Sequence, residues 1–490
     1  MTSIKSTKRA LITSALAILM CAAMLIGTTF AWFTDTASTG VNKIVSGNLK
    51  VDIIGADSDS HIEKLNFTKA ATTDAEAGAE ILWEPGCRYL TEGFRIANKG
   101  NLALKWKAQV NTGTTAANEG NFDLLDVIDF YLVTKAADGT ETETALDEFT
   151  GNLKKTETSD VYYIKGVMQT TAGNDYQGLT LDGISITVVA TQDTVESDSF
   201  DNQYDKDAEY PILVTTGDEL QAIVSNATAP VNIVLTNSIT TNNFVIPADK
   251  DVTLDLNGRT VTNAGSHTIL NKGHLTLTDS SADKSGQIIS LKGNTAALRN
   301  GDNAVCVVEG GTISRDGANG NTWHVVENFG KMTFNGGKVV LKNGNGFAIT
   351  NGWNYFDPGA STTHAVMEIN ALELDTDSSG IKNCRYGDLT VNDVTVTSTG
   401  YWALSNDYLG TAVINGGTLT SNSFKAVSNG AAMTVNGGTF DGTQGFFVQS
   451  YATSTVLNGG TFANMNVDAL SSYVGTGHTA QQSGTSVIIK

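Results

Sequence analysis

Carboxylates are the residues whose type and spacing best suit chemistry in this sequence. They recur in the second half of the chain as Asp375 and Asp377 in the stretch ELDTDSSG, and as Glu368, Asp393 and Asp407 in neighbouring segments. Inverting hydrolysis of a glycosidic bond needs two carboxyl groups roughly 6.5–9.5 Å apart. A lyase needs a base and acids that bind calcium. One hypothesis is therefore an enzyme that degrades polysaccharides, but scattered acids in an acidic chain are more often solvated, and we expect no catalysis.

Aromatic side chains in the same half suggest a different use. They are Trp323, Trp353, Tyr355, Phe356, Tyr386, Trp402 and Tyr408. Flat rings beside Asn and Asp suit stacking against sugars, and exposed aromatic clusters often mark binding surfaces. The sequence thus predicts a ligand face for glycans. The alternative is that several of these rings lie in the core.

Metal chemistry has weaker support. The chain has no CxxC, no HExxH and no pair of close histidines, so we expect no zinc site. The stretches from Asp57 to Ser60 and from Glu196 to Asp207 offer clustered oxygen ligands of the kind calcium takes. Their spacing fits no defined calcium loop. We expect no cofactor, with calcium as the remaining alternative.

The elements that carry the acids and aromatics are predicted from a repeat. Asparagine recurs at cognate positions: Asn257, Asn335, Asn370, Asn392, Asn415, Asn436 and Asn458. The last five are separated by 22, 23, 21 and 22 residues, and Glu309 fills the wider gap before Asn335. A period near 22 with two or three short strands is typical of a parallel β-helix, whose coils bury their apolar faces by stacking.

Details of the repeat predict how the coils turn and stack. Asn at the same turn of successive coils can stack amide on amide, and the following glycine pair relieves a tight corner by allowing a positive φ. The longer spacing before Asn370 coincides with GWNYFDPGASTTH, which we predict to be a lateral loop. A helix over 216–227, with a capping box from Thr216 to Glu219, is predicted to cap the first coil.

The first half of the chain follows a different pattern. RYLTEGFRIANKGNLALKWKAQV predicts strand, turn and strand, with the turn at 98–101 and alternating apolar residues on both flanks. VIDFYLV and GISITVVATQ are further predicted strands, and NFDLLDVI a short helix. One-sided alternation predicts a sandwich of two sheets.

The N-terminus indicates export. Lys5, Lys8 and Arg9 precede an apolar run over 10–27, and small residues follow at Thr29 and Ala31. This layout predicts a signal peptide over 1–31, cut between Ala31 and Trp32. A retained membrane anchor is the alternative, and a lipoprotein site at Cys21 is disfavoured by the preceding Met20.

Composition limits the partners. Removing 1–31 takes away three basic and no acidic residues, so the formal net charge falls from −20 to −23. Such a chain repels nucleic acid and anionic membrane surfaces, so we expect no nucleic-acid partner and membrane contact only through the signal segment. The remaining cysteines, Cys87, Cys306 and Cys384, are too few for a disulfide framework.

Five motifs in order make the first half resemble the TasA/camelysin family of exported Gram-positive surface proteins, which are processed by a SipW-type signal peptidase. They are GTTFAWFTD, VSGNLKVDI, WEPG, FRIANKGNLALKWK and NDYQGLTLDGISITVVATQDT, within residues 27–205. The resemblance implies a jelly-roll β-sandwich. It also implies fibre assembly by strand donation, here with a donor from Trp32 through Phe33 and Ile44 to about Leu49. The metalloprotease activity ascribed to some members has no zinc motif to support it.

VTLDLNGRTVTN, GHLTLTDSS and the NGGT units make the second half similar to right-handed parallel β-helices of the pectate-lyase-like superfamily, especially adhesin-like surface proteins. This is a likeness of fold, and fold does not carry function. The NTD, DD, GHG and RIK motifs of hydrolases in that superfamily are absent as a set, as is the pectate-lyase arginine motif. The appended β-helix departs from the TasA-like pattern, since it could decorate a fibre or prevent one.

Together these features predict an all-β protein with four parts. They are a signal peptide (1–31), a jelly-roll-like β-sandwich (32–207), a linker with a capping helix (208–230) and a right-handed parallel β-helix (231–490). We expect a secreted, non-enzymatic protein of the cell surface or biofilm matrix that assembles with itself or related matrix subunits and contacts glycans. The alternatives are a secreted polysaccharide lyase or glycoside hydrolase and a monomeric glycan-binding module.

Overall fold

The computed structural model describes residues 48–62, 65–68, 83–111, 114–115, 122–146, 149–182, 185–193, 209–316, 323–353 and 363–490. Within them the protein is all-β with a few short helices. The signal segment, most of the donor segment, the acidic stretch from Glu196 to Asp207, and the aromatics Tyr355 and Phe356 lie outside the described residues. No helix in the described ranges is long and apolar enough to cross a membrane.

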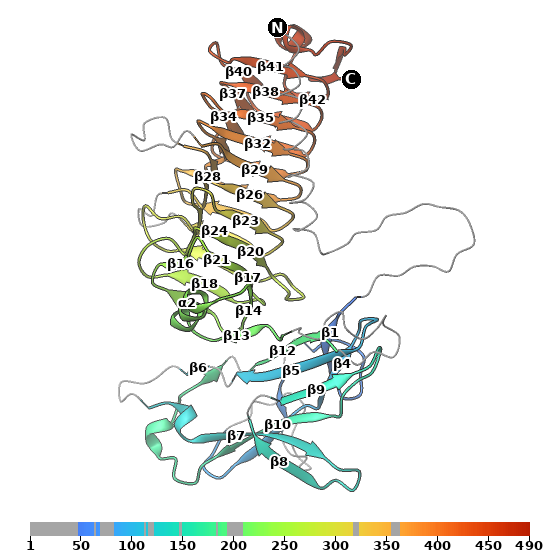
Figure 1. The fold of residues 1–490 in the computed structure, drawn as a ribbon, viewed down its shortest axis with the longest axis vertical. Coiled ribbons are helices and arrows are strands. Elements are labelled where there is room, and N and C mark those ends of the chain that lie inside the picture. The colour runs from blue at the N-terminus through green and yellow to red at the C-terminus, as the bar shows by residue number, and fades with distance from the viewer. Residues whose placement is uncertain are drawn as a thin grey trace, which may run out of the picture. The chain divides into compact units, whose positions relative to one another are not determined.

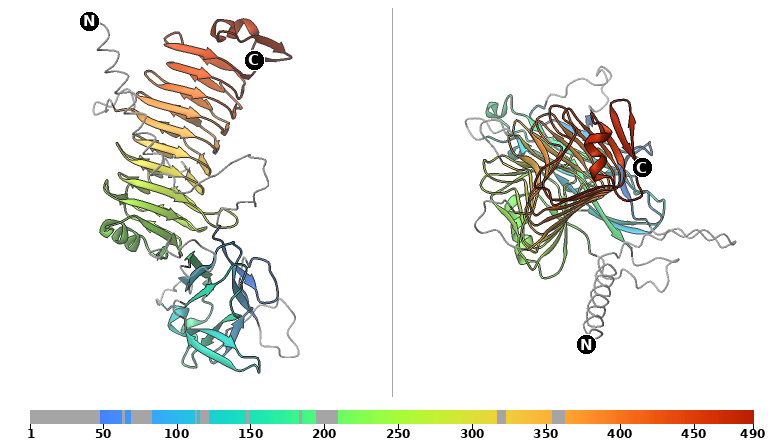
Figure 2. Two further views of the ribbon diagram at one scale, coloured as in Figure 1. Left: turned by 45° about the vertical axis from the view of Figure 1, so that its right-hand side comes forward. Right: turned by 90° about the horizontal axis from the view of Figure 1, so that it is seen from above.

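Residues 212–462 form a parallel β-solenoid, which confirms the predicted β-helix. Each coil contributes one short strand to each of three parallel sheets, and these run the length of the stack in Figures 1 and 2. The sheets are named I, II and III here in the order in which a coil visits them.

Sheet I contains β13 (Ile212–Val214), β14 (Val231–Leu235), β17 (Asp251–Asp255), β20 (His274–Thr278), β23 (Val305–Val308), β26 (Lys331–Phe334), β29 (Ala365–Ile369), β32 (Gly387–Val391), β35 (Thr411–Ile414), β38 (Ala432–Val435) and β41 (Ser454–Leu457). Sheet II contains β15 (Ile239–Thr241), β18 (Thr260–Asn263), β21 (Gln287–Ser290), β24 (Thr312–Asp316), β27 (Lys338–Lys342), β30 (Glu373–Thr376), β33 (Thr395–Ser398), β36 (Thr418–Ser421), β39 (Thr439–Gly442) and β42 (Gly460–Ala463). Sheet III contains β16 (Phe244–Ile246), β19 (Ile269–Asn271), β22 (Leu298–Asn300), β25 (Val326–Asn328), β28 (Phe347–Asn351), β31 (Ser379–Asn383), β34 (Leu404–Asn406), β37 (Val427–Asn429) and β40 (Phe446–Val448).

The core of the solenoid consists of columns of apolar side chains that point inward from equivalent strand positions. One column on sheet I includes Leu254, Leu277, Val308, Phe334, Ile369, Val391, Ile414 and Val435, all buried. Cys306 occupies an inward position on the same sheet, and burial raises the pKa of its thiol to about 12. This cysteine therefore acts as a small apolar side chain. Burying one side chain of leucine size contributes about 1.5–3 kcal/mol, so the stack is stabilised coil by coil.

The predicted asparagine ladder is present at the corner between sheets I and II. From Asn370 onward each amide donates to the side-chain oxygen of the preceding member, at 2.9, 2.7, 2.7, 2.8 and 3.0 Å, ending with Asn458. At the other end Asn335 donates to Glu309 at 2.8 Å. The prediction is wrong for Asn257, which is not part of this ladder, because its amide donates instead to the Leu235 backbone carbonyl at 2.9 Å.

The glycine pairs after these asparagines make the corner possible. Where a glycine pair follows the asparagine, as after Asn415 and Asn436, the second glycine has a positive φ, 94° at Gly417 and 106° at Gly438. A Cβ on the first glycine, Gly416, would lie 2.7 Å from the Asn392 backbone oxygen of the preceding coil. Both glycines are therefore required by the backbone in the coils that carry the pair, whereas Ala371-Leu372 and Asp393-Val394 follow Asn370 and Asn392.

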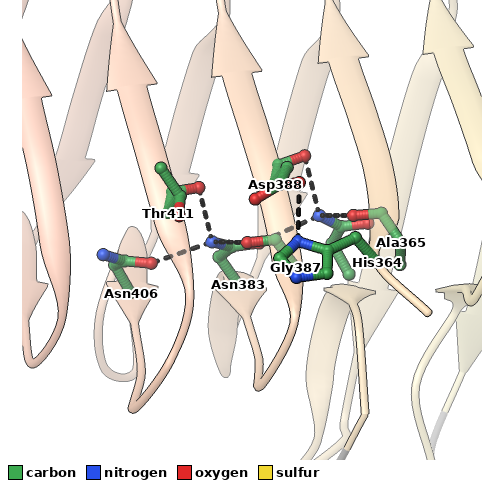
Figure 3. Close-up of polar contacts among 8 residues, drawn as sticks. His364, Ala365, Asn383, Gly387, Asp388, Asn406 and Thr411 are labelled. Carbon is green, nitrogen blue, oxygen red and sulfur yellow. Dashed lines mark hydrogen bonds and ion pairs between the residues drawn. The ribbon is translucent and has the colours of Figure 1, made fainter. Parts of the chain in front are cut away.

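A second asparagine ladder, not predicted, lies inside the corner between sheet III and the next strand of sheet I. Its members are Asn271, Asn300, Asn328, Asn351, Asn383, Asn406 and Asn429, all buried. Each amide from Asn271 to Asn406 donates to the side-chain oxygen of the next member at 2.8 or 2.9 Å. Figure 3 shows Asn383 donating to Asn406, Gly387 and Thr411. The ladder thus satisfies polar groups that no water reaches.

At the N-terminal end, the solenoid begins earlier than residue 231, because β13 already pairs in parallel with β14. The predicted helix lies between them as α2 (Gly217–Asn226), with Leu220 and Val224 buried. Thr216 accepts from the Glu219 N–H at 3.2 Å. The Glu219 carboxylate accepts from the Thr215 N–H at 2.9 Å. The capping box predicted a bond to the N–H of Thr216, so the observed partner is one residue earlier in the chain.

At the C-terminal end, sheet II continues with two antiparallel strands. β44 (Ser486–Ile489) pairs with β42, and β43 (Ala480–Ser483) pairs with β44. Between β42 and this hairpin lie α3 (Val467–Leu470) and the 3₁₀ helix η4 (Ser471–Tyr473), and Leu470 joins the apolar core.

The first half contains antiparallel strands in two larger sheets and one pair. The first sheet comprises β1 (Val51–Gly55), β2 (Phe67–Thr68), β3 (Arg88–Thr91), β4 (Phe94–Asn98), β7 (Ile128–Lys135), β8 (Glu141–Ala145) and β10 (Tyr162–Met168). The second comprises β5 (Leu104–Asn111), β9 (Phe149–Leu153) and β12 (Ser185–Gln192), and β6 (Thr114–Thr115) pairs with β11 (Leu181–Asp182). The 3₁₀ helices η1 (Leu124–Asp126) and η2 (Asn174–Tyr176) complete this part.

One apolar cluster contains residues of both larger sheets. Phe94 and Ile96 enter it from the first sheet, and Leu104 and Trp106 from the second. The predicted turn at 98–101 therefore leads from one sheet to the other. The short helix predicted in NFDLLDVI is η1, capped by Asp123, whose carboxylate accepts from the Leu125 N–H at 2.7 Å.

Candidate functional site

The outer face of sheet III changes character along the solenoid. From β22 onward its outward positions, one per coil in register, are Arg299, Glu327, Thr350, Lys382, Ser405, Ser428 and Phe447. The first part is charged, and the part from Ser405 onward is neutral. Because parallel strands repeat about every 4.8 Å, this face is a row of closely spaced side chains on a rigid support.

Charges in the first part are paired. Glu327 is 3% exposed and accepts from Arg299 Nη1 and from Trp323 Nε1, each at 3.0 Å. Burial raises the pKa of the Glu327 carboxyl. Further along, the Lys382 ammonium lies 3.2 Å from an Asp407 carboxylate oxygen. These pairs leave little net charge here.

A column of side chains lies where the chain enters sheet III. Each member stands four residues before an asparagine of the buried ladder, and we call this set the entry column: His267, Ala296, His324, Phe347, Ser379, Trp402 and Lys425. The two histidines accept backbone N–H groups of the next coil at Nδ1, from Ala296 at 2.8 Å and from Phe347 at 3.1 Å. Burial and neighbouring cations lower the pKa of each histidine to about 4.

The aromatic members of this region make a continuous row. Phe347 and Trp402 lie nearly parallel, with ring centroids 6.1 Å apart and an interplanar angle of 9°. The residue between them in the column is Ser379, whose small side chain leaves room for the two rings to approach each other. Trp402 also contacts Phe424 at 5.5 Å and Tyr401 at 5.9 Å.

Tyr401 is the exposed end of this group, with 55% of its surface accessible. Trp323 extends the row in the other direction, with its ring 5.4 Å from that of His324 and its Nε1 bound to Glu327. We define the aromatic row as Trp323, His324, Phe347, Tyr401, Trp402 and Phe424. Of the predicted ligand residues, Trp323 and Trp402 belong to it.

Trp353, Tyr386 and Tyr408, the other predicted aromatics within the described residues, follow the sheet III strands at their opposite end. Trp353 is 9% exposed and packs against Phe329, with ring centroids 4.5 Å apart, so little of its ring is open to a ligand. Tyr386 has a φ of 58° and contacts His364 at 5.6 Å, and Tyr408 is 44% exposed. The predicted single ligand face is therefore divided between two corners.

The predicted acids do not converge. Glu368 points outward from sheet I, and Asp375 from sheet II, where it pairs with Lys342 at 2.8 Å. Asp377 accepts from the Asn343 N–H at the corner after sheet II, and Asp407 follows sheet III. Asp393 lies at the corner between sheets I and II, so the five carboxylates are distributed around the solenoid.

Of the two stretches offered as calcium ligands, only the one from Asp57 to Ser60 lies within the described residues. Asp57 to Ser60 form an exposed turn after β1, where Ser60 N–H donates to Ser58 Oγ at 3.0 Å. Among the described residues, no three histidine, cysteine or acidic side chains gather closely enough to hold a metal ion. Cys87, Cys306 and Cys384 are unpaired within the same part of the chain.

No protein family matches the chain, and no curated protein is similar to it. The described fold therefore defines the protein as a parallel β-solenoid preceded by an antiparallel β region, and its function must be argued from the site.

Proposed function

We propose that this protein is a secreted, non-enzymatic protein of the cell surface or extracellular matrix of a Gram-positive-type bacterium, and that its solenoid contacts glycans through the aromatic row. The observation that carries the proposal is the stack of Phe347 and Trp402 beside the exposed ring of Tyr401. Sugars present flat C–H faces to such rings, while their hydroxyl groups need polar neighbours. The serines of sheet III and the Lys382–Asp407 pair supply those neighbours.

The matched test uses two tyrosines of nearly equal exposure. Tyr401 is 55% exposed beside Trp402, and Tyr451 is 56% exposed and contacts the region of Gly430 at the other end of the strands. We expect Tyr401→Ala to weaken glycan binding about tenfold, because an aromatic stacking contact contributes on the order of 0.5–1.5 kcal/mol. Tyr451→Ala should leave binding unchanged. A glycan array followed by calorimetry measures both, and equal affinities for the wild type and Tyr401→Ala would contradict the proposal.

A polysaccharide-degrading enzyme is the second candidate. Glu327 is the residue that favours it, since a buried carboxyl with a raised pKa suits a general acid. Both of its oxygens are already occupied by Arg299 and Trp323. New reducing ends or unsaturated sugars released from a bound glycan, and lost in Glu327→Gln, would favour this candidate over adhesion.

For the first half we propose a jelly-roll-like β-sandwich of the TasA type that assembles by strand donation. The apolar cluster shared by its two sheets supports the sandwich. Asn48 and Lys50 backbone oxygens accept from Asn101 and Lys99 of the same chain at 2.9 and 2.8 Å. Leu49 is thereby held in its own subunit, so the proposed donor segment ends before Asn48.

Size and morphology of the purified chain test this assembly. We expect filaments from residues 32–490 and monomers from residues 47–490, because the second chain lacks the donor segment. Light scattering and negative-stain imaging distinguish the two. Monomers from both chains would leave the glycan proposal intact and favour a monomeric binding module.

We further propose that α2 caps the first coil. Its Gln221 amide accepts from the Val245 N–H at 2.8 Å and donates to the Val245 carbonyl at 3.0 Å. This pair of hydrogen bonds imitates a neighbouring strand on β16, the first strand of sheet III. Covering an open edge in this way protects the solenoid from pairing with other chains.

A further inference from the structure

Lys425 is the cationic member of the entry column and lies one coil beyond Trp402. Its ammonium nitrogen stands 3.6 Å from the centroid of the Phe447 ring and 5.0 Å from that of Phe424. The side chain is half-buried between these rings. The aromatic row thus continues directly into a positively charged position.

Three other half-buried lysines of the solenoid have carboxylate partners. Lys338 lies 2.5 Å from Glu373, Lys342 lies 2.8 Å from Asp375, and Lys382 pairs with Asp407. Within the described ranges, Lys425 has no ion pair and donates no hydrogen bond. Acidic residues outnumber basic ones by 51 to 31 in this chain, so a half-buried lysine without a carboxylate departs from the general pattern.

The surroundings of Lys425 are neutral. The outward positions of sheet III beside it are Ser405, Ser428 and Phe447, and its neighbours at the corner are Ser423 and Gln444. Burial lowers the pKa of the Lys425 ammonium, which shows that the charge has lost part of its hydration. The flanking rings compensate in part through cation–π contacts. A charge-assisted hydrogen bond from a ligand anion would replace more of the lost hydration.

We propose that Lys425 receives an anionic group of the ligand, a carboxylate or a phosphate, while a sugar ring of the same ligand stacks on Tyr401 and Trp402. The ligand class is then an acidic glycan. This inference rests on the proposed glycan contact at the aromatic row and adds the charge of the ligand to it. The neutral surroundings let one lysine attract the anion, although the whole chain is strongly acidic.

The test measures binding of the full mature chain to three polymers: alginate, whose uronic acids carry carboxylates, its propylene glycol ester, in which they are blocked, and poly(glycerol phosphate). Lys425→Met keeps the length of the apolar stem without the charge, and Lys425→Arg keeps the charge. We expect Lys425→Met to weaken binding of an anionic polymer by about tenfold to a hundredfold, and Lys425→Arg to retain most of it. Added salt should weaken wild-type binding.

Lys331→Met is the matched control, because Lys331 is an exposed lysine on sheet I, and it should bind like the wild type. Loss with alginate alone identifies a carboxylate ligand, and loss with poly(glycerol phosphate) alone identifies a phosphate ligand. Equal binding of alginate and its ester by both the wild type and Lys425→Met would overturn the inference and leave the glycan proposal standing. Binding of none of the polymers by the wild type would contradict both.

Discussion

Replacing Asn383 by alanine is expected to lower the free energy of unfolding of the solenoid by about 3–4 kcal/mol. Asn383 is fully buried, accepts from Asn351 at 2.9 Å and donates to Asn406 at 2.8 Å. It also donates to the carbonyls of Gly387 and Thr411, both at 2.9 Å (Figure 3). The two N–H groups of the amide are shared among three acceptors. Alanine removes these bonds and leaves buried polar groups that water cannot reach, at about 1–3 kcal/mol for each group left unpaired.

Asn415→Ala in the outer ladder is the matched control. Asn415 likewise donates to one asparagine, Asn392, and accepts from another, Asn436, at 2.7 and 2.8 Å. These bonds are exposed, so water replaces them and the expected loss is below about 1 kcal/mol. Denaturant unfolding, with the solenoid transition assigned by hydrogen exchange in its three sheets, measures both losses. Equal losses would mean that burial is not what makes the inner ladder important.

Acidification is expected to destabilise the solenoid between about pH 6.5 and pH 4. The pKa of His324 is lowered to about 4 in the folded protein, chiefly by burial and also by Lys382 and Arg315. The unfolded chain therefore binds a proton in this range that the folded chain does not. The stabilising contribution is complete above the ordinary pKa of 6.5 and is lost as the pH falls through the folded value. Its size is up to about 3 kcal/mol, reduced where solvent reaches the ring.

His324→Gln isolates this effect, because its side-chain oxygen can accept the Phe347 N–H and glutamine does not titrate. We expect its melting temperature to fall less than that of the wild type between pH 7 and pH 4. His274→Gln is the control, since His274 is exposed on sheet I, and it should follow the wild type. Parallel pH profiles for His324→Gln and the wild type would show that His324 does not cause the acid sensitivity. The pKa of His267 in the entry column is lowered in the same direction. The melting temperature of His324→Gln should therefore still fall in part as the pH is lowered.

The outer corner of the solenoid was predictable because three of its features repeat at nearly constant spacing. An asparagine and an apolar alternation recur every 21 to 23 residues in the last coils, with a glycine pair after Asn415, Asn436 and Asn458, and parallel stacking converts this period into columns. Asn257 was wrongly included because its local sequence resembles the others, while its side chain bonds to a backbone carbonyl.

The buried ladder was not predicted, because the spacings between its members vary with insertions at other corners. These spacings are 29, 28, 23, 32, 23 and 23 residues. A signal was nevertheless present in the short segments ITN, IKN, LSN and VSN, in which an apolar residue two places before the asparagine points inward. The residue four places before each asparagine marks the entry column. This four-residue spacing would have placed Phe347 and Lys425 in the same column as Trp402.

The sequence by itself determined the parallel solenoid, the outer ladder and several strands of the first half, among them β4, β5, β7 and β12, because each depends on local periodicity and turn chemistry. Only the tertiary structure decided which side chains share a face. The solenoid strands have only three to five residues, so each has few outward positions. The register between coils decides which outward side chains are neighbours, and every insertion changes their spacing in the sequence. It therefore separated Trp353 from Trp402, distributed the acids around three sheets, and placed Lys425 in the column next to Trp402.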